Sequence, residues 1–526
     1  MFMVRHRILH SRQLILRWNS KLIALQFSAK ISLYSTFGYN DCVLKLHDKV
    51  SSSSIVTIAA NRIRTLYTDS CMDKQLEEIF ALKDTNISNW VIEAKIQSLC
   101  CWYSTQSKYE KQSFIRLLAY RYAVNHNDIC QLANKLVCSE PDNQKQMIIN
   151  KRLLKNALTP VYQWLFVLMG RLEYGVKFLV DLRTDVLELI SETKEADQIM
   201  IIQQLNLTLQ ELLLLWFSVS FLHLERITWQ SSCDILQKVS DYEAIHPIRN
   251  WIDLKRRVGP YRRCYVFTHP SMPREPLVVL HTALCDEIPT TVKGIQEAEQ
   301  RILGMRMEAT SFLQEDKNKI KAAIFYSIAS TQKGLQGIEL GNYLIKEVVK
   351  TVINEFPMID QLSSLSPIPN FRLWLLDRIK QNAHEIFNDE EYDVIQKSLE
   401  SKDLFKSLKK TFDNSLWMND HKLITILEKP LVRACARYLY TEKRRNYALN
   451  SVANFHLRNG AVMWRINWLA DPSPRGSANS CGIMVNYRYF VNETETNSRD
   501  YIEKKLIRAS ESVISLAEQA EELKNK

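Results

Sequence analysis

Two short stretches of the sequence carry side chains that can do proton chemistry together. One is SSLSPIPNF, residues 363–371, which contains Ser366, and the other is VANFHLRNG, residues 452–460, which contains His456. A histidine can donate a proton near neutral pH, and a serine hydroxyl can hold an anion or accept a proton. The local sequence alone also fits two plainer explanations, a turn hydroxyl before Pro367 and a core histidine among apolar neighbours.

A glycine loop lies upstream of Ser366, between a predicted strand and a predicted helix. Residues 321–329 have the apolar character of a strand, and the apolar residues between 344 and 356 share one helical face. The intervening STQKGLQGIELG contains Gly334, Gly337 and Gly341, which let the backbone approach a bulky anion favoured by the helix N-terminus. Both the GK[ST] ending of a P-loop and the GxGxxG pattern are missing, so a purely structural turn remains an alternative.

The same unit predicts where Ser366 lies. Pro357 ends the helix, and residues 361–371 follow as a return strand. A ligand held by its pyrophosphate at the loop would extend its reactive arm to the end of that strand, which places Ser366 in the expected site. Residues 487–489, on a later predicted strand, are candidate neighbours of His456.

A basic stretch, residues 246–270, is a second candidate for phosphate binding. Its cations attract phosphates in one interpretation and form a solvated face at a domain junction in the other. They are Arg249, Lys255, Arg256, Arg257, Arg262 and Arg263.

Glycine and proline usage divides the chain into a helical part and a mixed part. Between residues 39 and 258 only two glycines and three prolines occur, and stretches such as residues 113–136 repeat apolar side chains every three to four positions. This pattern predicts an all-α helical bundle over residues 70–217. We expect residues 218–526 to form an α/β domain, which makes the fold class α+β and multidomain.

The mixed part contains five short runs that are β-branched or aromatic and bounded by turn residues. These runs predict strands, with helices between them, and the chain is expected to close with a helix over residues 498–524. The five runs are residues 264–267, 276–284, 321–329, 461–470 and 481–490.

Composition excludes several classes of protein. Hydrophobic residues make up 46% of the 526 residues, which is enough for two or three domain cores. The longest apolar run, residues 212–224, is too short to span a membrane, and it predicts a buried helix. The eleven cysteines show no CxxC pair and no histidine partners at the spacing of a zinc site. No HExxH, EF-hand, nucleophile-elbow or kinase motif occurs, so neither a metal site nor a hydrolase is indicated.

Much of the net charge of +11 comes from the N-terminus. Residues 1–40 contain six Lys/Arg and no Asp/Glu, which leaves +5 for the rest, and no aromatic-interleaved basic patch follows to favour nucleic acid. Arg, Ser and apolar residues predict a cleaved mitochondrial presequence over residues 1–40, with a disordered basic arm as the alternative. The C-terminal ELKNK lacks the peroxisomal Ser-Lys-Leu signal, so we expect the mitochondrial matrix and leave the cytoplasm and peroxisome open.

Beyond these local patterns, the chain resembles the malonyl-CoA decarboxylase family. The resemblance extends along nearly the whole chain after the presequence and is most specific in HPIRNWIDLKRRVGPYRRCYVFTHP, YSIASTQKGLQGIELGNYLIK, SSLSPIPNF and YALNSVANFHLRNGAVMWRINWLADPSPRG. It implies an N-terminal helical bundle for oligomerisation, a tetramer in our expectation, and a catalytic domain similar to GNAT acetyltransferases. It also implies malonyl-CoA as substrate, acetyl-CoA and CO2 as products, and no metal or organic cofactor.

The resemblance further implies which residues form the site. Ser366 and His456 match the family's catalytic serine and histidine, and QGIELGN matches its CoA-binding loop. Glu339 stands where the acetyltransferase pattern Q-x-x-G-x-G has its first glycine, which counts against acyl transfer to an amine. That activity and a catalytically silent CoA-binding scaffold remain the alternatives. The expected substrate-binding residues are Gln336, Gly337, Ile338, Glu339, Leu340, Gly341, Asn342, Ser366 and His456.

Overall fold

The computed structural model describes residues 72–83, 85–139, 143–217, 221–303, 315–338, 340–400 and 403–525. The predicted presequence, residues 1–40, lies outside these ranges. The chain divides into two compact units, one formed by Met1–Ile87 with Thr105–Leu117 and the other by Ser88–Ser104 with Leu118–Lys526. The first unit contains a helix over residues 72–81, and the second contains the candidate site.

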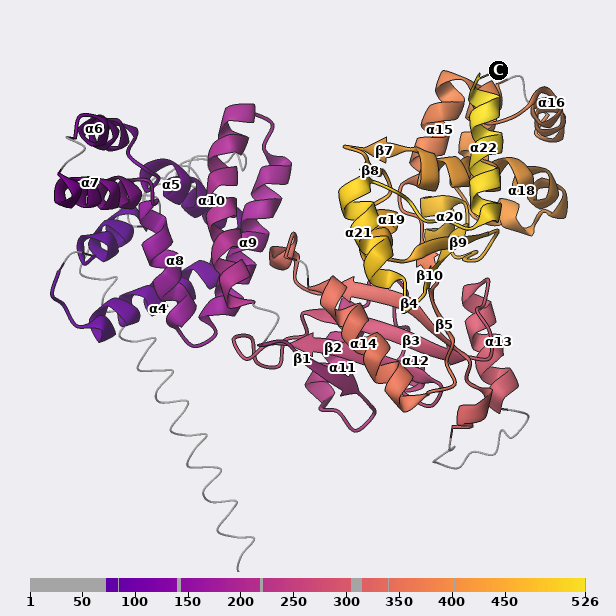
Figure 1. Cartoon of the computed structure of the whole chain (residues 1–526), viewed down its shortest axis with the longest axis horizontal. Coiled ribbons are helices and arrows are strands. Elements are labelled where there is room, and N and C mark those ends of the chain that lie inside the picture. Colours follow the sequence, from indigo (N-terminus) through magenta and orange to yellow (C-terminus); the bar gives the residue numbers. More distant parts are fainter. Residues whose placement is uncertain are drawn as a thin grey trace, which may run out of the picture. The chain divides into compact units, whose positions relative to one another are not determined.

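The N-terminal part is helical throughout the residues that the structure describes, as predicted (Figure 1). Helices α8, α9 and α10 pack on one another through fully buried side chains such as Phe166, Leu179 and Leu205, one from each helix. The helices are α4 (Asn89–Thr105), α5 (Lys108–Arg121), α6 (His126–Val137), α7 (Gln144–Ala157), α8 (Val161–Arg171), α9 (Gly175–Glu192) and α10 (Ala196–Trp216).

Helix α10 is, within the described ranges, the one helix long and apolar enough to cross a membrane by length and composition. Its buried residues, among them Ile202, Leu205 and Leu209, lie on the face that packs against α8 and α9. The predicted buried helix over residues 212–224 is wrong in its second half, because α10 ends at Trp216 and residues 223–227 form a strand.

Among its described residues, the C-terminal part is built on one mixed sheet of eight strands. Its order is β1-β2-β3-β4-β5-β10-β6, with β9 paired to β10, and every pairing is antiparallel except that of β4 with β5. The strands are β1 (His223–Ile227), β2 (Arg262–Thr268), β3 (Val278–Cys285), β4 (Ala322–Ser330), β5 (Gln361–Ser364), β6 (Ser366–Pro367), β9 (Val462–Asn467) and β10 (Met484–Tyr489). A small hairpin, β7 (Lys443–Arg444) with β8 (Tyr447–Ala448), lies apart from this sheet.

Helices cover the sheet and complete the predicted α+β fold, which is confirmed. Helix α14 makes the crossover from β4 to β5 and packs across β1 to β4, while α13 packs on β3. The helices are α11 (Cys233–Tyr242), α12 (Trp251–Arg257), α13 (Val292–Leu303), α14 (Gly341–Glu355), α15 (Phe371–Gln381), α16 (Asp389–Ser398), α17 (Leu404–Phe412), α18 (His421–Ala436), α19 (Ser451–Arg458), α20 (Pro474–Ser480), α21 (Thr494–Lys504) and α22 (Glu511–Asn525).

The sheet opens beside β4. Strand β5 pairs with β4 only from Ala322 to Phe325, and the chain then leaves β4 and pairs as β6 with β10, where Ser366 lies opposite Val485. From Ser327 to Ser330, β4 is paired with β3 on one edge and has no strand on the other among the described residues, and Tyr326 is an extra residue at a bulge. This split places an unpaired strand edge next to Ser366.

Candidate active site

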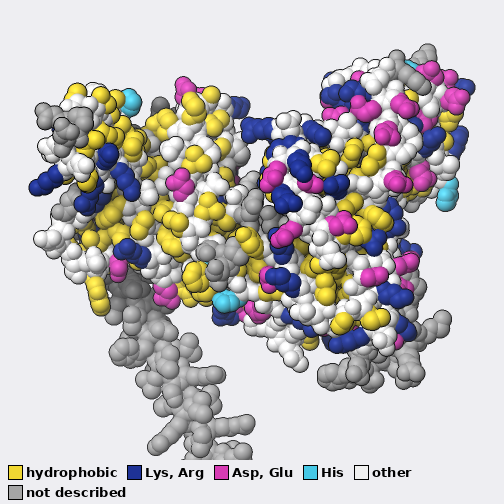
Figure 2. Space-filling view, viewed as in Figure 1, with side chains coloured by type: hydrophobic (Ala, Val, Ile, Leu, Met, Phe, Trp, Pro, Cys, Tyr) yellow, Lys and Arg dark blue, Asp and Glu magenta, His cyan; other side chains and the backbone are white. Residues whose placement is uncertain are grey.

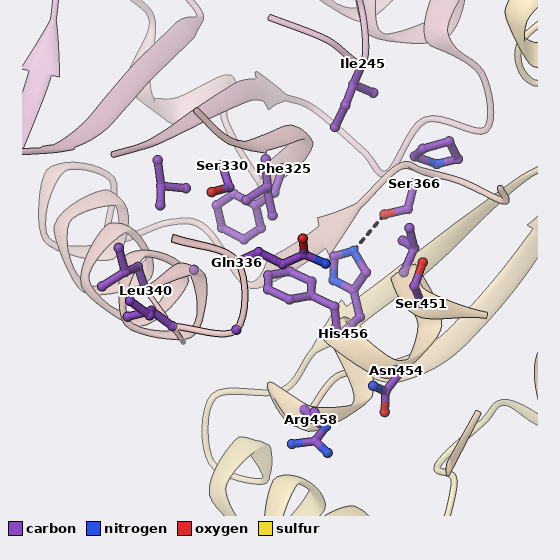
Figure 3. A pocket seen from close by; sticks show the side chains of 18 of the residues that line it. Ile245, Phe325, Ser330, Gln336, Leu340, Ser366, Ser451, Asn454, His456 and Arg458 are labelled. Carbon is purple, nitrogen blue, oxygen red and sulfur yellow. Dashed lines mark hydrogen bonds between the residues drawn. The ribbon is translucent and has the colours of Figure 1, made fainter. Parts of the chain in front are cut away.

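Ser366 and His456 meet at the split in the sheet. Ser366 Oγ lies 2.9 Å from His456 Nε2, and both residues are buried, at 4% and 3% exposure (Figure 3). Ser366 comes from β6, and His456 lies on α19, the helix that directly precedes β9. The two residues are 90 positions apart in the sequence and form one hydrogen-bonded pair.

Asn450 holds α19 against the serine segment. Its side-chain oxygen caps the helix by accepting hydrogen bonds from the backbone of Val452 and Ala453, and its Nδ2 donates to the carbonyl of Pro369, 3.0 Å away. Tyr438 donates to the same carbonyl. The two hydrogen bonds to Pro369 therefore hold the segment that follows Ser366 against α19, which carries His456.

Strand β10 supplies the other neighbours of His456. Tyr487 stacks on the imidazole, and Tyr489 Oη lies 2.7 Å from Nδ1. Arg488 points to the opposite face of the strand, against Trp464 and Phe490, because side chains alternate along a strand. Of the three candidate neighbours in the sequence, the structure thus brings the two tyrosines to the site.

Burial sets the protonation state of the pair. It lowers the pKa of His456 to about 3, so the imidazole is neutral near pH 7, and it raises the pKa of Tyr489, so the phenol keeps its proton. The remaining partner is Ser364, whose Oγ accepts a 2.8 Å hydrogen bond from Ser366 and a second bond from the Tyr487 N–H. Local sequence did not single out Ser364, although its spacing of two from Ser366 was a usable signal.

A cavity of about 690 Å³ leads to this pair. Its walls are mostly apolar, and Arg458 is the one charged residue among those described as lining it. Figure 3 shows Leu340 and Ser366 on opposite sides of the cavity, with Gln336 between them. The lining residues are Ile245, Val278, Phe325, Tyr326, Ile328, Ser330, Gln336, Gly337, Ile338, Leu340, Gly341, Ser366, Pro367, Ser451, Val452, Asn454, Phe455, His456 and Arg458.

The predicted CoA loop therefore contributes five of its seven residues to the cavity wall. Glu339 lies outside the described residues, and Asn342 is the second residue of α14, with a side chain that the structure does not describe. Gly337 has φ of +82°, which favours glycine, and an added Cβ at Gly341 would come within 3.1 Å of Phe455. Gly334 faces α9 instead of the cavity.

Four arginines of the basic stretch are paired with carboxylates of the same chain. Arg256 and Arg262 both bond Glu299, Arg257 bonds Asp253, and Arg263 bonds Glu315 and Glu355. These pairs favour a structural role over phosphate binding. No group of three or more possible metal ligands occurs in the part of the chain that the structure describes.

Comparison with known proteins shows the family to which a chain of this architecture belongs. A helical N-terminal part, a split mixed sheet and a buried serine–histidine pair define a two-part α+β protein with an enzyme-like site. The family model of the malonyl-CoA decarboxylase N-terminal domain matches residues 122–217, and that of the C-terminal domain matches residues 220–526. The chain belongs to the malonyl-CoA decarboxylase family, which confirms the resemblance found in the sequence.

Individual relatives agree with the family models. The mitochondrial malonyl-CoA decarboxylases of Anser anser anser and Mus musculus are each 45% identical, over 410 residues (76% of this chain, 79% of that protein) and 417 residues (78% and 82%). Crystal structures of malonyl-CoA decarboxylase from Rhodopseudomonas palustris and Agrobacterium vitis match with TM-scores of 0.71 and 0.69. Each is 27% identical and covers 85% of this chain and 99% of its own.

Proposed function

We propose that this chain decarboxylates malonyl-CoA to acetyl-CoA and CO2, and thereby controls the malonyl-CoA level in fatty acid metabolism. One observation carries the proposal: the buried Ser366–His456 pair lies across one cavity from the glycine loop and the N-terminus of α14 (Figure 3). A CoA thioester has matching chemistry, with phosphates at one end and the acyl group at the other. Membership of the malonyl-CoA decarboxylase family supports malonyl as that acyl group.

The binding mode follows from the split sheet. The free edge of β4, from Ser327 to Ser330, offers backbone groups to the amides of the pantetheine arm, as a neighbouring strand would. No described side chain caps the N-terminus of α14, where the phosphates bind to backbone N–H groups in this proposal. The proposed substrate-binding residues are Gln336, Gly337, Ile338, Glu339, Leu340, Gly341 and Asn342 of the loop, with Ser366 and His456 at the acyl end.

The proposed reaction needs a charge sink and a proton donor. When the bond between the carboxylate and the methylene carbon breaks, its electron pair moves into the thioester carbonyl and forms an enolate. The thioester itself is the sink, so no cofactor is required. Ser366 orients the malonyl carboxylate by turning its O–H from Ser364 Oγ toward a carboxylate oxygen. His456 delivers a proton to the enolate carbon.

The direction of the hydrogen bonds supports this division of roles. Because Tyr489 keeps its proton, it donates to His456 Nδ1, and the neutral imidazole then carries its proton on Nε2, facing Ser366. In the proposed step Nε2 gives this proton to carbon while Nδ1 takes the proton of Tyr489. A proton from solvent restores the phenol, so one proton is consumed for each CO2 released.

The test follows both products with no amine acceptor present. The purified chain is incubated with malonyl-CoA while CO2 and acetyl-CoA are measured together, beside Ser366→Ala, His456→Ala and the surface control Ser515→Ala. We expect equimolar products in the wild type, a loss of about a hundredfold or more in the two site variants, and no change in the control. If free CoA is released only in a parallel assay to which an amine is added, the chain is an acyltransferase. CoA binding without turnover in either assay would indicate a scaffold.

We also propose that residues 70–217 form a helical oligomerisation domain, residues 218–526 form the catalytic domain, and the chain assembles as a homotetramer. Figure 2 shows many hydrophobic side chains on the visible surface of the helical part, and α10 exposes Met200, Leu207, Leu214 and Leu215. Exposed apolar patches mark interaction surfaces. A monomeric mass in light scattering at micromolar concentration would contradict the assembly.

For location, we propose the mitochondrial matrix. The curated relatives are named mitochondrial, and residues 1–40 have the composition of a presequence. Fusion of residues 1–40 to a fluorescent protein should direct it to mitochondria. A diffuse or peroxisomal signal of the full chain would instead support the cytoplasm or the peroxisome.

A further inference from the structure

The loop before α14 rests on the helical part of the chain. Its turn η3 (Lys333–Leu335) packs on α9, and a Cβ added at Gly334 would lie 1.9 Å from the carbonyl oxygen of Val180. Lys333 Nζ lies 3.4 Å from Glu188 at the same contact. The backbone of the loop at Gly334 therefore lies in direct contact with the backbone of α9, although the two are far apart in the sequence.

Arg183 on α9 makes the central bonds of this contact. Its guanidinium donates to the carbonyls of Gly334, at 2.5 Å, and Gln336, at 2.9 Å, and Nε donates to Asn206 on α10. Arg183 is 2% exposed, and no carboxylate among the described residues acts on its charge, since burial is the one cause of its pKa shift. A buried cation without a carboxylate is costly, and burial lowers the pKa of Arg183, yet a guanidinium stays protonated.

The bond to Gln336 fixes the peptide that joins Gln336 to Gly337. In a trans peptide the C=O and the N–H point in opposite directions, so an oxygen held by Arg183 directs the Gly337 N–H away from α9. Gly337 lines the cavity, and its N–H has no acceptor among the described residues. Its own carbonyl accepts a 3.3 Å bond from Gln210 on α10.

We propose that Arg183 is a positioning residue for the phosphates of the CoA thioester, which it serves by presenting the Gly337 N–H to them. The bond between the guanidinium and the Gln336 carbonyl also polarises that peptide and makes its N–H a stronger donor. The helical part therefore shares in substrate binding as well as in assembly. This inference rests on the proposed use of a CoA substrate.

The test compares a substrate that has phosphates with one that lacks them. Steady-state kinetics on the full chain use malonyl-CoA and malonyl-N-acetylcysteamine with Arg183→Met, Arg183→Lys and the milder Gln210→Met. Lys177→Met is the matched control, because Lys177 lies on the same helix in an exposed ion pair with Asp181. Circular dichroism and thermal melting check that each variant is folded.

For Arg183→Met we expect a KM for malonyl-CoA raised about tenfold or more, a kcat within about twofold, and no change in kcat/KM for malonyl-N-acetylcysteamine. Arg183→Lys should recover part of the loss, and Gln210→Met should raise the KM for malonyl-CoA about twofold to threefold. An equal loss on both substrates would show a merely structural role and overturn the proposal. Unchanged kinetics on both substrates would overturn it as well.

Two further outcomes are separable. If Arg183→Met fails to fold, Gln210→Met decides the matter, and an unchanged KM for malonyl-CoA overturns the inference. If the wild type does not decarboxylate malonyl-CoA, the proposed function fails. Calorimetric titration with CoA then still tests whether Arg183 contributes to CoA binding. An affinity about tenfold weaker in Arg183→Met, with Lys177→Met unchanged, supports the positioning role, and equal affinities contradict it.

Discussion

The ring of Tyr487 lies almost flat on the imidazole of His456, with centroids 4.5 Å apart and 16° between the planes. On the imidazole edge, Tyr489 contacts Nδ1 and Ser366 contacts Nε2. The histidine is therefore enclosed by groups that carry no charge, which explains why burial alone shifts its titration.

Replacing Tyr489 by phenylalanine should lower kcat about tenfold or more. The change removes the donor that holds the proton of His456 on Nε2, while the ring and its packing remain. Steady-state kinetics with malonyl-CoA measure the effect. Tyr265→Phe is the control, because Tyr265 is buried in the same sheet and its hydroxyl has no partner among the described residues. Full kcat in Tyr489→Phe would remove the phenol from the proposed proton path.

The value of kcat/KM should not fall near neutral pH through protonation of His456. Since burial lowers the pKa of His456 to about 3, the free protein keeps a neutral imidazole at every pH above about 4. We expect kcat/KM for malonyl-CoA to be level from about pH 5 to 8. A fall with an apparent pKa near 6.5 would show that His456 titrates as an exposed imidazole does.

Stability should decrease as pH falls below about 6.5. Burial lowers the pKa of His456 to about 3. Burial also lowers the pKa of His281 to about 4, against the opposing effect of the buried Glu243 carboxylate 3.3 Å away. The unfolded chain therefore binds protons at these histidines that the folded chain does not. Each histidine then costs about 1.4 kcal/mol between pH 7.5 and 5.5. Urea unfolding at both pH values measures the difference.

One variant separates this effect from general acid sensitivity. His281→Gln should lose less stability on acidification than the wild type, by about the 1.4 kcal/mol attributed to one buried histidine. Identical losses in the wild type and His281→Gln would contradict a neutral buried His281.

Gly334→Ala should weaken substrate binding and stability together. The added Cβ would lie 1.9 Å from the Val180 carbonyl, so the loop must move off α9, at a cost of about 1–3 kcal/mol. Thermal melting and the KM for malonyl-CoA report the two effects. Gly294→Ala is the control, because its Cβ would meet nothing closer than 3.1 Å. A wild-type KM and melting temperature in Gly334→Ala would contradict the tight contact.

Sequence periodicity predicted the elements well where a single face is buried. The helix over residues 344–356 and the strand over residues 321–329 appear as α14 and β4. The expected last helix, residues 498–524, is wrong because Lys505 adopts a φ of +59° and the chain pairs beside Met463 before α22 begins. Such tertiary pairing overrides local helix propensity, and no local pattern records it.

Local patterns alone could not predict which residues form the site. Family resemblance pointed to Ser366 and His456, but their encounter is produced by β10, which pairs with β5, β6 and β9 together. The contribution of Arg183 was not visible in the sequence at all, since an arginine 153 positions before Gln336 gives no local sign of contact. Long-range pairing of this sort is the part that periodicity cannot supply.

The apolar walls of the cavity act as a solvent for the proposed reaction. Among the described lining residues only Arg458 carries a charge, so a malonyl carboxylate that enters gives up much of its hydration. Its charge is concentrated on two oxygens before the bond breaks and is spread over the departing CO2 and the thioester afterwards. A medium of low polarity penalises the concentrated charge more than the dispersed one, so the walls themselves lower the barrier to CO2 loss.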